Sequence, residues 1–368
     1  MMNDSYFSLY FLWLFSTSLF ISQSTYSLVL IPILYILFFS KDLISFKIEK
    51  TIYIFLIIIF LSMFFAGYFG GHGFSPFFYI FNTFVLFLCA LLTVDKFTPK
   101  SLYYASKFLY FSLLVFMLLT LLYFWGDKEP FAKVIPGSST NGFPTFLLLL
   151  NVFYVSTSYC YKNNVSIIVP LFTIFMAFYG VGRGTLVVSF LLLIFVFSLN
   201  MSSKNYGYKS YFKYLFISCF ILTLILNFNL IYSFFSLYTK LSVGLVDTNR
   251  LEILFDYFNK LTDLQSVLFG ADYSNTVISD KYKGNPHIAF VRSHSMFGFI
   301  YLFMVFFSPL LILFCGKKFK EIYIYGGCIL LFWLRAISEP NLFPAFFDYF
   351  YFIIFIIAYK KSVARNVF

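Results

Sequence analysis

An arginine set among glycines is the first group in this sequence whose type and surroundings indicate a binding site. Gly180, Gly182 and Gly184 surround Arg183 between two apolar runs. Glycine lets a backbone approach a ligand closely. An arginine at a helix N-terminus suits a phosphate, because guanidinium binds phosphate through paired hydrogen bonds and helix-end amides add partial positive charge. The pattern also fits a short turn whose arginine extends to lipid headgroups, and both interpretations stay open.

A second arginine, Arg250, lies in the one long polar stretch of an otherwise apolar chain. It falls in the first turn of a predicted amphipathic helix over about 249–262, which Asn249 can cap and in which Glu252 completes a capping-box spacing. The apolar residues of this helix recur at helical spacing: Leu251, Leu254, Phe255, Phe258 and Leu261. We expect this stripe on the membrane surface or against other helices, with Arg250 either at a phosphate or paired with an acid such as Asp247.

Two histidines occur in the same polar stretch, residues 241–299. His287 follows an Asn-Pro pair, which predicts an extended entry into the next helix. A neutral imidazole there can act as a general base toward a substrate hydroxyl, because its pKa lies near working pH; it could equally be a solvated loop residue. Arg292 and His294 share this neighbourhood, Arg292 as a contributor to an anion site and His294 as the alternative functional histidine.

No metal site is predicted. The five cysteines all fall inside or at the ends of apolar runs, where they indicate neither a disulfide framework nor a set of zinc ligands. The polar stretch also lacks an Asp-x-Asp element. Arginine is therefore favoured over a divalent ion as the partner of a phosphate or diphosphate.

The composition is that of a membrane protein, since 61% of the residues are hydrophobic and 11% are charged, against about half and about a quarter in soluble domains. Only helices or closed barrels satisfy backbone hydrogen bonding in hydrocarbon, and continuous apolar runs predict helices. Twelve runs approach the roughly 20 residues that a spanning helix needs. They are residues 6–22, 26–40, 51–69, 77–94, 102–125, 142–160, 165–179, 185–199, 214–235, 297–314, 323–337 and 346–359. The sequence thus predicts an all-α polytopic membrane protein with one transmembrane domain over residues 1–368.

The charges of the connecting loops separate into two sets. The loops 41–50, 95–107, 161–164, 200–213 and 315–322 and both tails hold 16 Lys and Arg and five acids, whereas the remaining ten Lys and Arg and ten acids belong to the other side. Because Lys and Arg near helix ends favour the cytoplasm, both termini are predicted to be cytoplasmic and the large loop 239–296 to face outward. The net charge of +11 then reflects topology and affinity for anionic lipid headgroups, and no nucleic-acid partner is predicted.

In their order and spacing, these motifs resemble those of the O-antigen polymerase and O-antigen ligase superfamily. They are a Gly-x-Arg-Gly turn that begins a helix, a large outward loop that opens with Asn-Arg-Leu at Arg250, a Leu-Phe-Gly turn that ends at Gly270, and His287 eleven residues before Gly298. The resemblance covers the topology throughout, but its motifs occupy only residues 180–185 and 247–301.

One position departs from the family pattern. Families of this kind often carry Asn, Ser or Gln directly after the histidine, where this chain has Ile288. His294-Ser295 provides such a pair but lacks the glycine at the expected distance. We prefer His287 as the functional histidine.

The resemblance implies a GT-C-like membrane glycosyltransferase that acts at the periplasmic face of a bacterial inner membrane. Its donor and acceptor would be undecaprenyl-diphosphate-linked oligosaccharides, its surroundings membrane lipids and its further partner a chain-length regulator, with no cofactor. Arg183 and Arg250 would stabilise the diphosphate leaving group, His287 would be the general base, and Arg292 and His294 would bind substrate. Direct attack by the acceptor hydroxyl would invert the anomeric carbon.

Several functions fit such a chain, and we favour an O-antigen or surface polysaccharide polymerase. A ligase would instead transfer the glycan to lipid A core. A flippase or transporter for lipid-linked oligosaccharides would carry charges along a central cavity, whereas the positions inside these predicted helices are almost all apolar. In a purely structural membrane partner, Arg183 and His287 would have no catalytic role.

Overall fold

The computed structural model describes residues 27–39, 50–134, 139–201, 233, 248–315, 319–340 and 342–363. Within these ranges the secondary structure is helical, joined by turns and loops, and contains no β-strand, which confirms the all-α prediction for the part described. The predicted spans 6–22 and, except for Ser233, 214–235 lie outside the described residues, as does Asp247.

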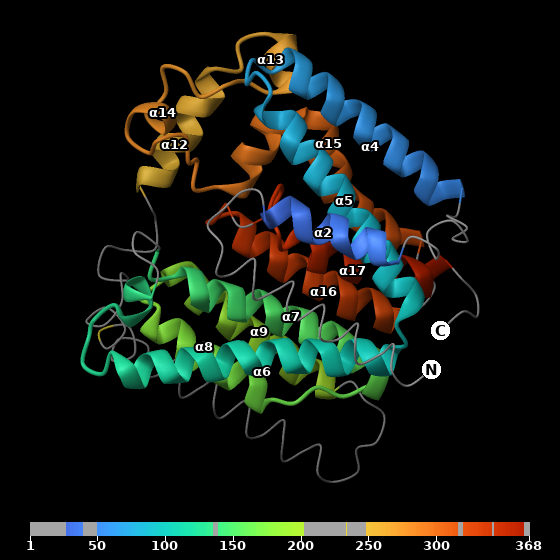
Figure 1. Ribbon diagram of the computed structural model, residues 1–368, viewed down its shortest axis with the longest axis vertical. Coiled ribbons are helices and arrows are strands. Elements are labelled where there is room, and N and C mark those ends of the chain that lie inside the picture. The colour runs from blue at the N-terminus through green and yellow to red at the C-terminus, as the bar shows by residue number, and fades with distance from the viewer. Residues whose placement is uncertain are drawn as a thin grey trace. The chain divides into compact units, whose positions relative to one another are not determined.

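The helices coincide with the apolar runs (Figure 1). They are α2 (Ser27–Phe38), α4 (Lys50–Phe69), α5 (Ser75–Lys96), α6 (Pro99–Tyr123), the 3-10 helix η1 (Pro130–Lys133), α7 (Gly142–Lys162), α8 (Ile168–Tyr179), α9 (Arg183–Met201), α12 (Thr248–Asn259), α13 (Leu264–Phe269), α14 (Val277–Asp280), α15 (Ala289–Cys315), α16 (Phe319–Ala336) and α17 (Asp348–Val363). Five of them, α5, α6, α7, α9 and α15, are long and apolar enough to cross a membrane. This is the architecture of a membrane-embedded protein; the number of twelve spans stays a prediction.

The chain forms two compact units. Unit 1 comprises Met1–Ala105 and Thr248–Phe368, and unit 2 comprises Ser106–Asp247. In unit 2, α7 is the most buried helix and packs against α8 and α9. Polar side chains inside unit 2 bond to one another, as where Asn151 Nδ2 donates to Thr173 Oγ1 at 2.7 Å. The single transmembrane domain expected over the whole chain stays a prediction.

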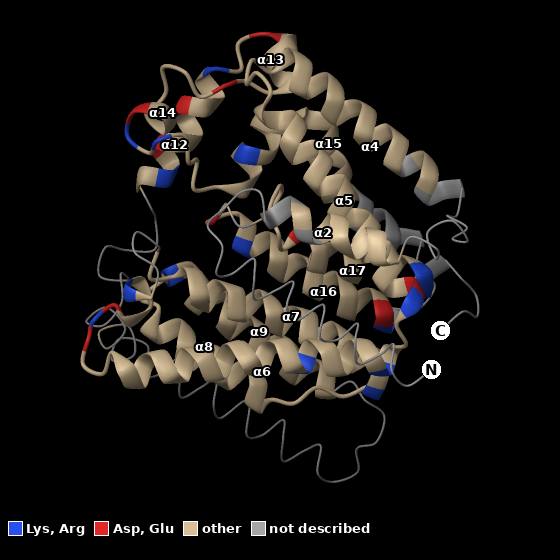
Figure 2. Ribbon diagram, in the orientation of Figure 1, with Lys and Arg blue, Asp and Glu red and all other residues tan. Residues whose placement is uncertain are grey.

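Unit 1 collects α12, α13 and α14 at one end, which we call the loop end. Here α4 ends, α5 and α15 begin, and α16 passes into the segment that precedes α17 (Figure 1). Within unit 1, α15 packs against α4, and α17 packs against α5 and α16. At the opposite end Lys360 Nζ lies 3.7 Å from Asp95 Oδ1. Charged residues are concentrated around α12 and α14, whereas the described parts of α4 and α5 are uncharged over most of their length (Figure 2).

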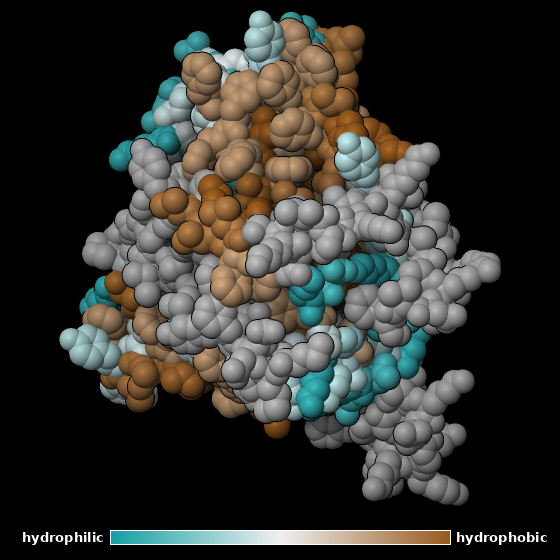
Figure 3. Space-filling view, turned by 45° about the vertical axis from the view of Figure 1, so that its right-hand side comes forward, coloured by the Kyte–Doolittle hydropathy of each residue, from teal (hydrophilic) through white to brown (hydrophobic). Residues whose placement is uncertain are grey.

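A broad apolar surface covers unit 1, shown in brown in Figure 3. On α4, large apolar side chains are exposed along the whole described length: Tyr53, Ile54, Ile57, Ile58, Phe60, Leu61, Phe64, Phe65, Tyr68 and Phe69. A helix that is apolar all round is stable in contact with lipid rather than water. The surface of α4 is therefore suited to a bilayer.

A break in α15 gives the loop end its shape. Gly298 has φ 74° and ψ 179°, which divides α15 into a short polar segment and a long apolar one. A Cβ at Gly298 would overlap Leu268 O, and a Cβ at Gly270, whose φ is +85°, would overlap His294 O. Both glycines are required because the end of α13 is inserted into the break. The helix thus begins at Ala289, before the predicted start of the span at Phe297.

The predicted apolar stripe of α12 divides between two environments. Ile253 and Tyr257 are the buried residues of α12, and they form a small core with residues of α14 and the start of α15, against which Leu254 and Leu261 of the stripe pack. Leu251, Phe255 and Phe258 of the stripe are exposed. That these three side chains contact a membrane surface stays a prediction.

The expected capping box at Asn249 is also not formed. Asn249 lies inside α12, and its Oδ1 and Glu252 Oε2 are both within hydrogen-bonding distance of Lys281 Nζ, at 3.3 and 3.2 Å. A capping box does occur at the next helix, where Asp263 and Ser266 bond reciprocally. The two acceptors of α12 therefore attach it to the segment after α14.

Candidate functional site

Three arginines approach one short segment at the loop end. Arg335 Nη2 lies 3.0 Å from Glu339 Oε1, and Arg250 Nη2 lies 3.9 Å from the same oxygen. Arg292 Nη1 donates to Pro340 O at 3.2 Å. These three arginines with Glu339 are called the arginine cluster below. Its members come from α12, α15 and the end of α16, so only the folded chain assembles it.

The arginine cluster is partly buried and electropositive. Arg335 is 1% exposed, while the Arg250 and Glu339 side chains are 29% and 19% exposed. Asp348 also interacts electrostatically with Arg292, so the described part of this region brings three guanidinium groups near two carboxyl groups. A bound anion would interact favourably with this group of arginines. Guanidinium groups suit phosphate oxygens in particular.

Arg292 is held in place by an aromatic ring. Its guanidinium carbon lies 5.0 Å from the centroid of the Tyr79 ring on α5, a cation–π distance. With the bond to Pro340, this contact holds Arg292 between α5 and the segment after α16. The expectation that Arg292 contributes to an anion site therefore has a geometric basis. Arg250 pairs with Glu339, which is distant from it in sequence.

Arg183 begins α9 in unit 2, as the sequence suggests. Its glycines serve packing within the chain, since a Cβ at Gly180 would overlap Pro144 and a Cβ at Gly182 would overlap Asn141. Val181 between them has φ 60°, an unusual value for a β-branched residue. The glycines thus bring the turn against the start of α7. That Arg183 shares a site with Arg250 stays a prediction.

His287 stands immediately before α15 with φ 53°. Its backbone N–H donates to Asn285 Oδ1 at 3.0 Å, and its ring meets the ring of Tyr282 edge-on at 5.2 Å. The residue is partly exposed. Its role as general base stays a prediction.

His294 bonds through both ring nitrogens within the protein. Nδ1 lies 2.8 Å from Tyr257 Oη, and Nε2 lies 2.8 Å from Val267 O. Since a carbonyl can only accept, Nε2 carries the proton and Nδ1 accepts from the tyrosine. His294 therefore connects α15 with α12 and α13, and a substrate contact would have to replace one of these bonds.

The third histidine, His72, lies at the loop end although sequence reasoning did not select it. It occupies the turn between α4 and α5, and its Nε2 is 2.5 Å from Ser295 Oγ and 3.1 Å from Ala271 O. The signal was present, because Gly70, Gly71 and Gly73 surround His72 much as three glycines surround Arg183. His72 was not predicted as a functional residue because its turn lies far in sequence from the long polar stretch.

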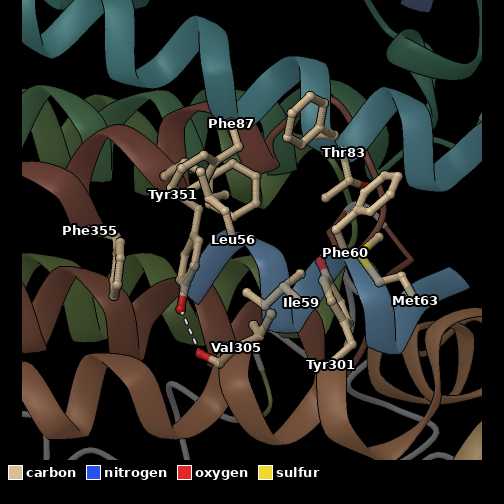
Figure 4. A pocket seen from close by; sticks show the side chains of 12 residues that line it. Leu56, Ile59, Phe60, Met63, Thr83, Phe87, Tyr301, Val305, Tyr351 and Phe355 are labelled. Atoms are coloured by element: carbon tan, nitrogen blue, oxygen red, sulfur yellow. Dashed lines mark hydrogen bonds between the residues drawn. The ribbon is translucent and has the colours of Figure 1, made fainter. Parts of the chain in front are cut away.

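An apolar pocket lies deeper in unit 1, between α4, α5, α15 and α17 (Figure 4). Phe60 and Met63 of α4 face Tyr301 of α15, and Tyr351 donates to Val305 O at 3.0 Å. Thr83 of the lining bonds to Tyr79 O, one helical turn away on α5. The pocket lining therefore reaches to one helical turn from Tyr79, whose ring contacts the guanidinium group of Arg292.

No family model, curated protein or solved structure matches this chain. The resemblance described above consequently rests on its motifs alone. In the structure two of those motifs meet, because the Leu-Phe-Gly turn ending at Gly270 packs into the break at Gly298. This contact gives the spacing of the motifs a physical reason.

Among the described residues, no group of three or more His, Cys, Asp and Glu side chains could hold a metal ion. The ionisable groups at the loop end include the arginine cluster, the three histidines and several ion pairs, among them Lys260–Asp272 at 2.5 Å and Lys281–Glu252 at 3.2 Å. Burial raises the pKa of the Asp272 carboxyl, but hydrogen bonds from Lys260 and Ser274 outweigh this and hold the pKa below its usual value. Such a set can bind an anion and accept a proton.

Proposed function

We propose that this protein is a lipid-linked glycosyltransferase, an O-antigen or surface polysaccharide polymerase that joins undecaprenyl-diphosphate-linked repeat units. The observation that supports this most is the arginine cluster at one end of apolar helices, close to an apolar pocket. A polyprenyl diphosphate needs both environments, one for its charged phosphates and one for its hydrocarbon. We place the site at the periplasmic face of the bacterial inner membrane, in a GT-C-like fold of about twelve spans.

In the proposed reaction, an acceptor hydroxyl attacks the anomeric carbon of the donor. A carbon–oxygen bond forms, the bond from that carbon to the phosphate oxygen breaks, and the diphosphate leaves with the electron pair. Negative charge develops on the leaving oxygen, and fixed guanidinium groups stabilise it in the transition state. Attack from the opposite side inverts the anomeric configuration. Arg250 and Arg292 supply this stabilisation, and Arg183 remains a predicted third contributor.

Arg335 has a positioning role in this proposal. It is the most buried of the three arginines and bonds to both Ser338 and Glu339, at 2.6 and 3.0 Å. These bonds hold the segment that Arg250 and Arg292 approach. The apolar pocket, which lies between α4, α5, α15 and α17, would accept part of the polyprenyl chain.

The test is the surface polysaccharide of a deletion strain, separated on a lipopolysaccharide gel and complemented with variants expressed at the wild-type level. We expect single core-linked repeat units in the deletion strain. Arg250→Ala should lower the rate of chain extension by about 10²-fold, the usual effect of losing one transition-state donor. Lys128→Gln, at an exposed position of unit 2, is the matched control and should restore the full ladder.

Other outcomes of this experiment contradict the proposal. Complete absence of core-linked repeats in the deletion strain would indicate a ligase. Accumulation of precursor on the cytoplasmic side would indicate a flippase, and an unchanged ladder would exclude all three activities. Purified protein in lipid nanodiscs, supplied only with lipid-linked repeat units, should extend them without added metal or nucleotide sugar.

A further inference from the structure

His72 is anchored at one ring nitrogen. Its Nε2 is in contact with Ser295 Oγ and Ala271 O, and Ser295 Oγ donates its own proton to Ala271 O at 2.7 Å. The carbonyl can only accept, and the serine proton is already used. Nε2 therefore carries the proton and donates it, which leaves the lone pair of the neutral ring on Nδ1.

The other ring nitrogen is accessible. Nδ1 of His72 makes no hydrogen bond to any described residue, and it is not among the buried polar atoms that lack a partner. On one side the turn packs against α13, because a Cβ at Gly70 would lie 3.1 Å from Phe269 O. On the other side it is open, because a Cβ at Gly73 would meet nothing within 4 Å and one at Gly71 would meet only Asp272 at 3.8 Å. A ligand group would approach His72 from this open side.

The surroundings keep His72 neutral. Burial lowers the pKa of His72 below its usual value of 6.5, and the nearby Lys260 acts in the same direction. The interactions with the Ala271 and Ser295 backbones and the charge of Asp272 oppose this lowering but do not cancel it. Tyr273, whose ring is 5.3 Å from the imidazole, adds no charge at neutral pH, since burial raises its pKa from 10 to about 12. A neutral imidazole with an accessible lone pair is the form that a general base requires.

His72 also belongs to the same structure as the arginine cluster. Ser295, its anchor, stands one helical turn after Arg292 in the first segment of α15, so the two lie on one face of that helix. The charge of Arg292 also acts on Tyr273, against which the His72 ring packs. A hydroxyl at Nδ1 and a diphosphate at the arginines would thus share one end of unit 1.

We propose that His72, rather than His287, accepts the proton of the attacking sugar hydroxyl through Nδ1. The proposal rests on the proposed glycosyltransferase function. The hydroxyl oxygen forms its bond to the anomeric carbon, its proton passes to Nδ1, and the diphosphate departs with the electrons of the broken bond. The resulting imidazolium keeps its Nε2 bonds to Ser295 and Ala271, and solvent removes the extra proton before the next turnover.

The experiment measures kcat and KM for repeat-unit extension by the full chain in lipid nanodiscs. His72→Gln is the informative variant, because the glutamine amide can replace the Nε2–H donor while it offers no base. We expect kcat to fall by about 10²-fold or more, with KM and the melting temperature close to wild type. His287→Gln is measured in parallel, and the ratio of the two kcat values decides between the histidines.

Two further measurements distinguish a role of His72 in proton transfer from a purely structural role. In the wild-type protein kcat/KM should fall as pH drops below about 6.5, because protonated His72 cannot accept the hydroxyl proton, and this dependence should vanish in His72→Gln. Ser295→Ala, which removes one anchor of the ring, should lower kcat by a smaller factor and retain the pH dependence.

The proposal is overturned if His72→Gln retains wild-type kcat, or if only His287→Gln loses it. It is also overturned if His72→Gln loses activity solely through a lower melting temperature or weaker binding. These results leave the glycosyltransferase function intact. If the wild-type protein itself extends no lipid-linked repeat unit, the proposed function fails instead, and the two failures are therefore distinguishable.

Discussion

Two turns in this chain surround one ionisable residue with glycines, and the structure uses the glycines differently. At Arg183, in unit 2, Gly180 and Gly182 lie where a Cβ would overlap Pro144 and Asn141 of α7. At His72, in unit 1, Gly71 and Gly73 have φ values of +79° and +63°, and their surroundings are open. The first turn needs Gly180 and Gly182 for close packing, whereas in the second turn Gly71 and Gly73 are needed for their backbone conformation and only Gly70 is closely packed.

The comparison shows what a glycine-rich motif does and does not indicate. Both sequences suggest a backbone that approaches a ligand. In the Arg183 turn the backbone approaches the start of α7 rather than a ligand. Across this contact Thr185 donates a hydrogen bond to Asn141 Oδ1 at 2.6 Å. In the His72 turn Gly70 packs against Phe269, but the space beside Gly71 and Gly73 remains unfilled. The His72 turn therefore has an open side that a ligand can approach, whereas the Arg183 turn presents only its arginine.

The largest effect on stability is expected from Gly180→Ala. The new methyl group would overlap the rigid ring of Pro144, and overpacking of this kind costs about 1–3 kcal/mol. The melting temperature of the detergent-solubilised protein should fall accordingly. Gly142→Ala is the matched control, because it lies in the same contact region at the start of α7 with nothing within 4 Å of the new Cβ. Equal melting temperatures for the two variants would contradict the packing role.

A smaller loss of stability is expected from Gly73→Ala in the His72 turn. The Cβ meets no atom within 4 Å, so the penalty comes only from φ +63°, and alanine in this region costs about 1 kcal/mol. Chemical unfolding of the two glycine variants under the same conditions measures the difference. A loss larger than that of Gly180→Ala would show that the His72 turn is the more tightly packed one.

The smallest effect is a pH dependence confined to the His72 turn. Because the pKa of His72 is lowered in the folded protein, an opened state binds the proton more readily. The stabilisation is complete above about pH 6.5 and is lost as pH falls through the lower folded-state pKa. Hydrogen exchange in residues 264–273, compared between wild type and His72→Gln at each pH, should show extra opening of wild type only at acidic pH. His294 is common to both proteins, so its contribution cancels.

The helices were largely predictable because their bounds follow composition. The run predicted at 51–69 is α4 at Lys50–Phe69, and the run predicted at 142–160 is α7 at Gly142–Lys162. In the start of α15 the pattern misled, since a polar segment there is helical. The polar groups of His294 and Ser295 form hydrogen bonds with α12, α13 and the α4–α5 turn. These partners are distant in sequence, so the local sequence could not predict them.

The candidate site was predictable only in part. Arg250 and Arg292 were selected from the sequence, and the structure adds Arg335 and places all three around the segment at Glu339. Arg335 and Glu339 stand four residues apart, a spacing at which residues on a helix are neighbours. The sequence could not show that Arg250 also pairs with the carboxylate of Glu339, because no local pattern relates two residues so far apart in the chain.

What the sequence determined by itself is the kind of molecule: continuous apolar runs require helices in a bilayer, and glycine and arginine mark the turns worth inspecting. What only the tertiary structure decided is which ionisable groups meet. His294 is engaged at both nitrogens and His72 at one, and this difference depends on carbonyls and hydroxyls contributed by other helices. A hydrogen bond between distant segments requires a particular distance in space but no particular separation along the chain. Such bonds can therefore be identified only from the folded structure.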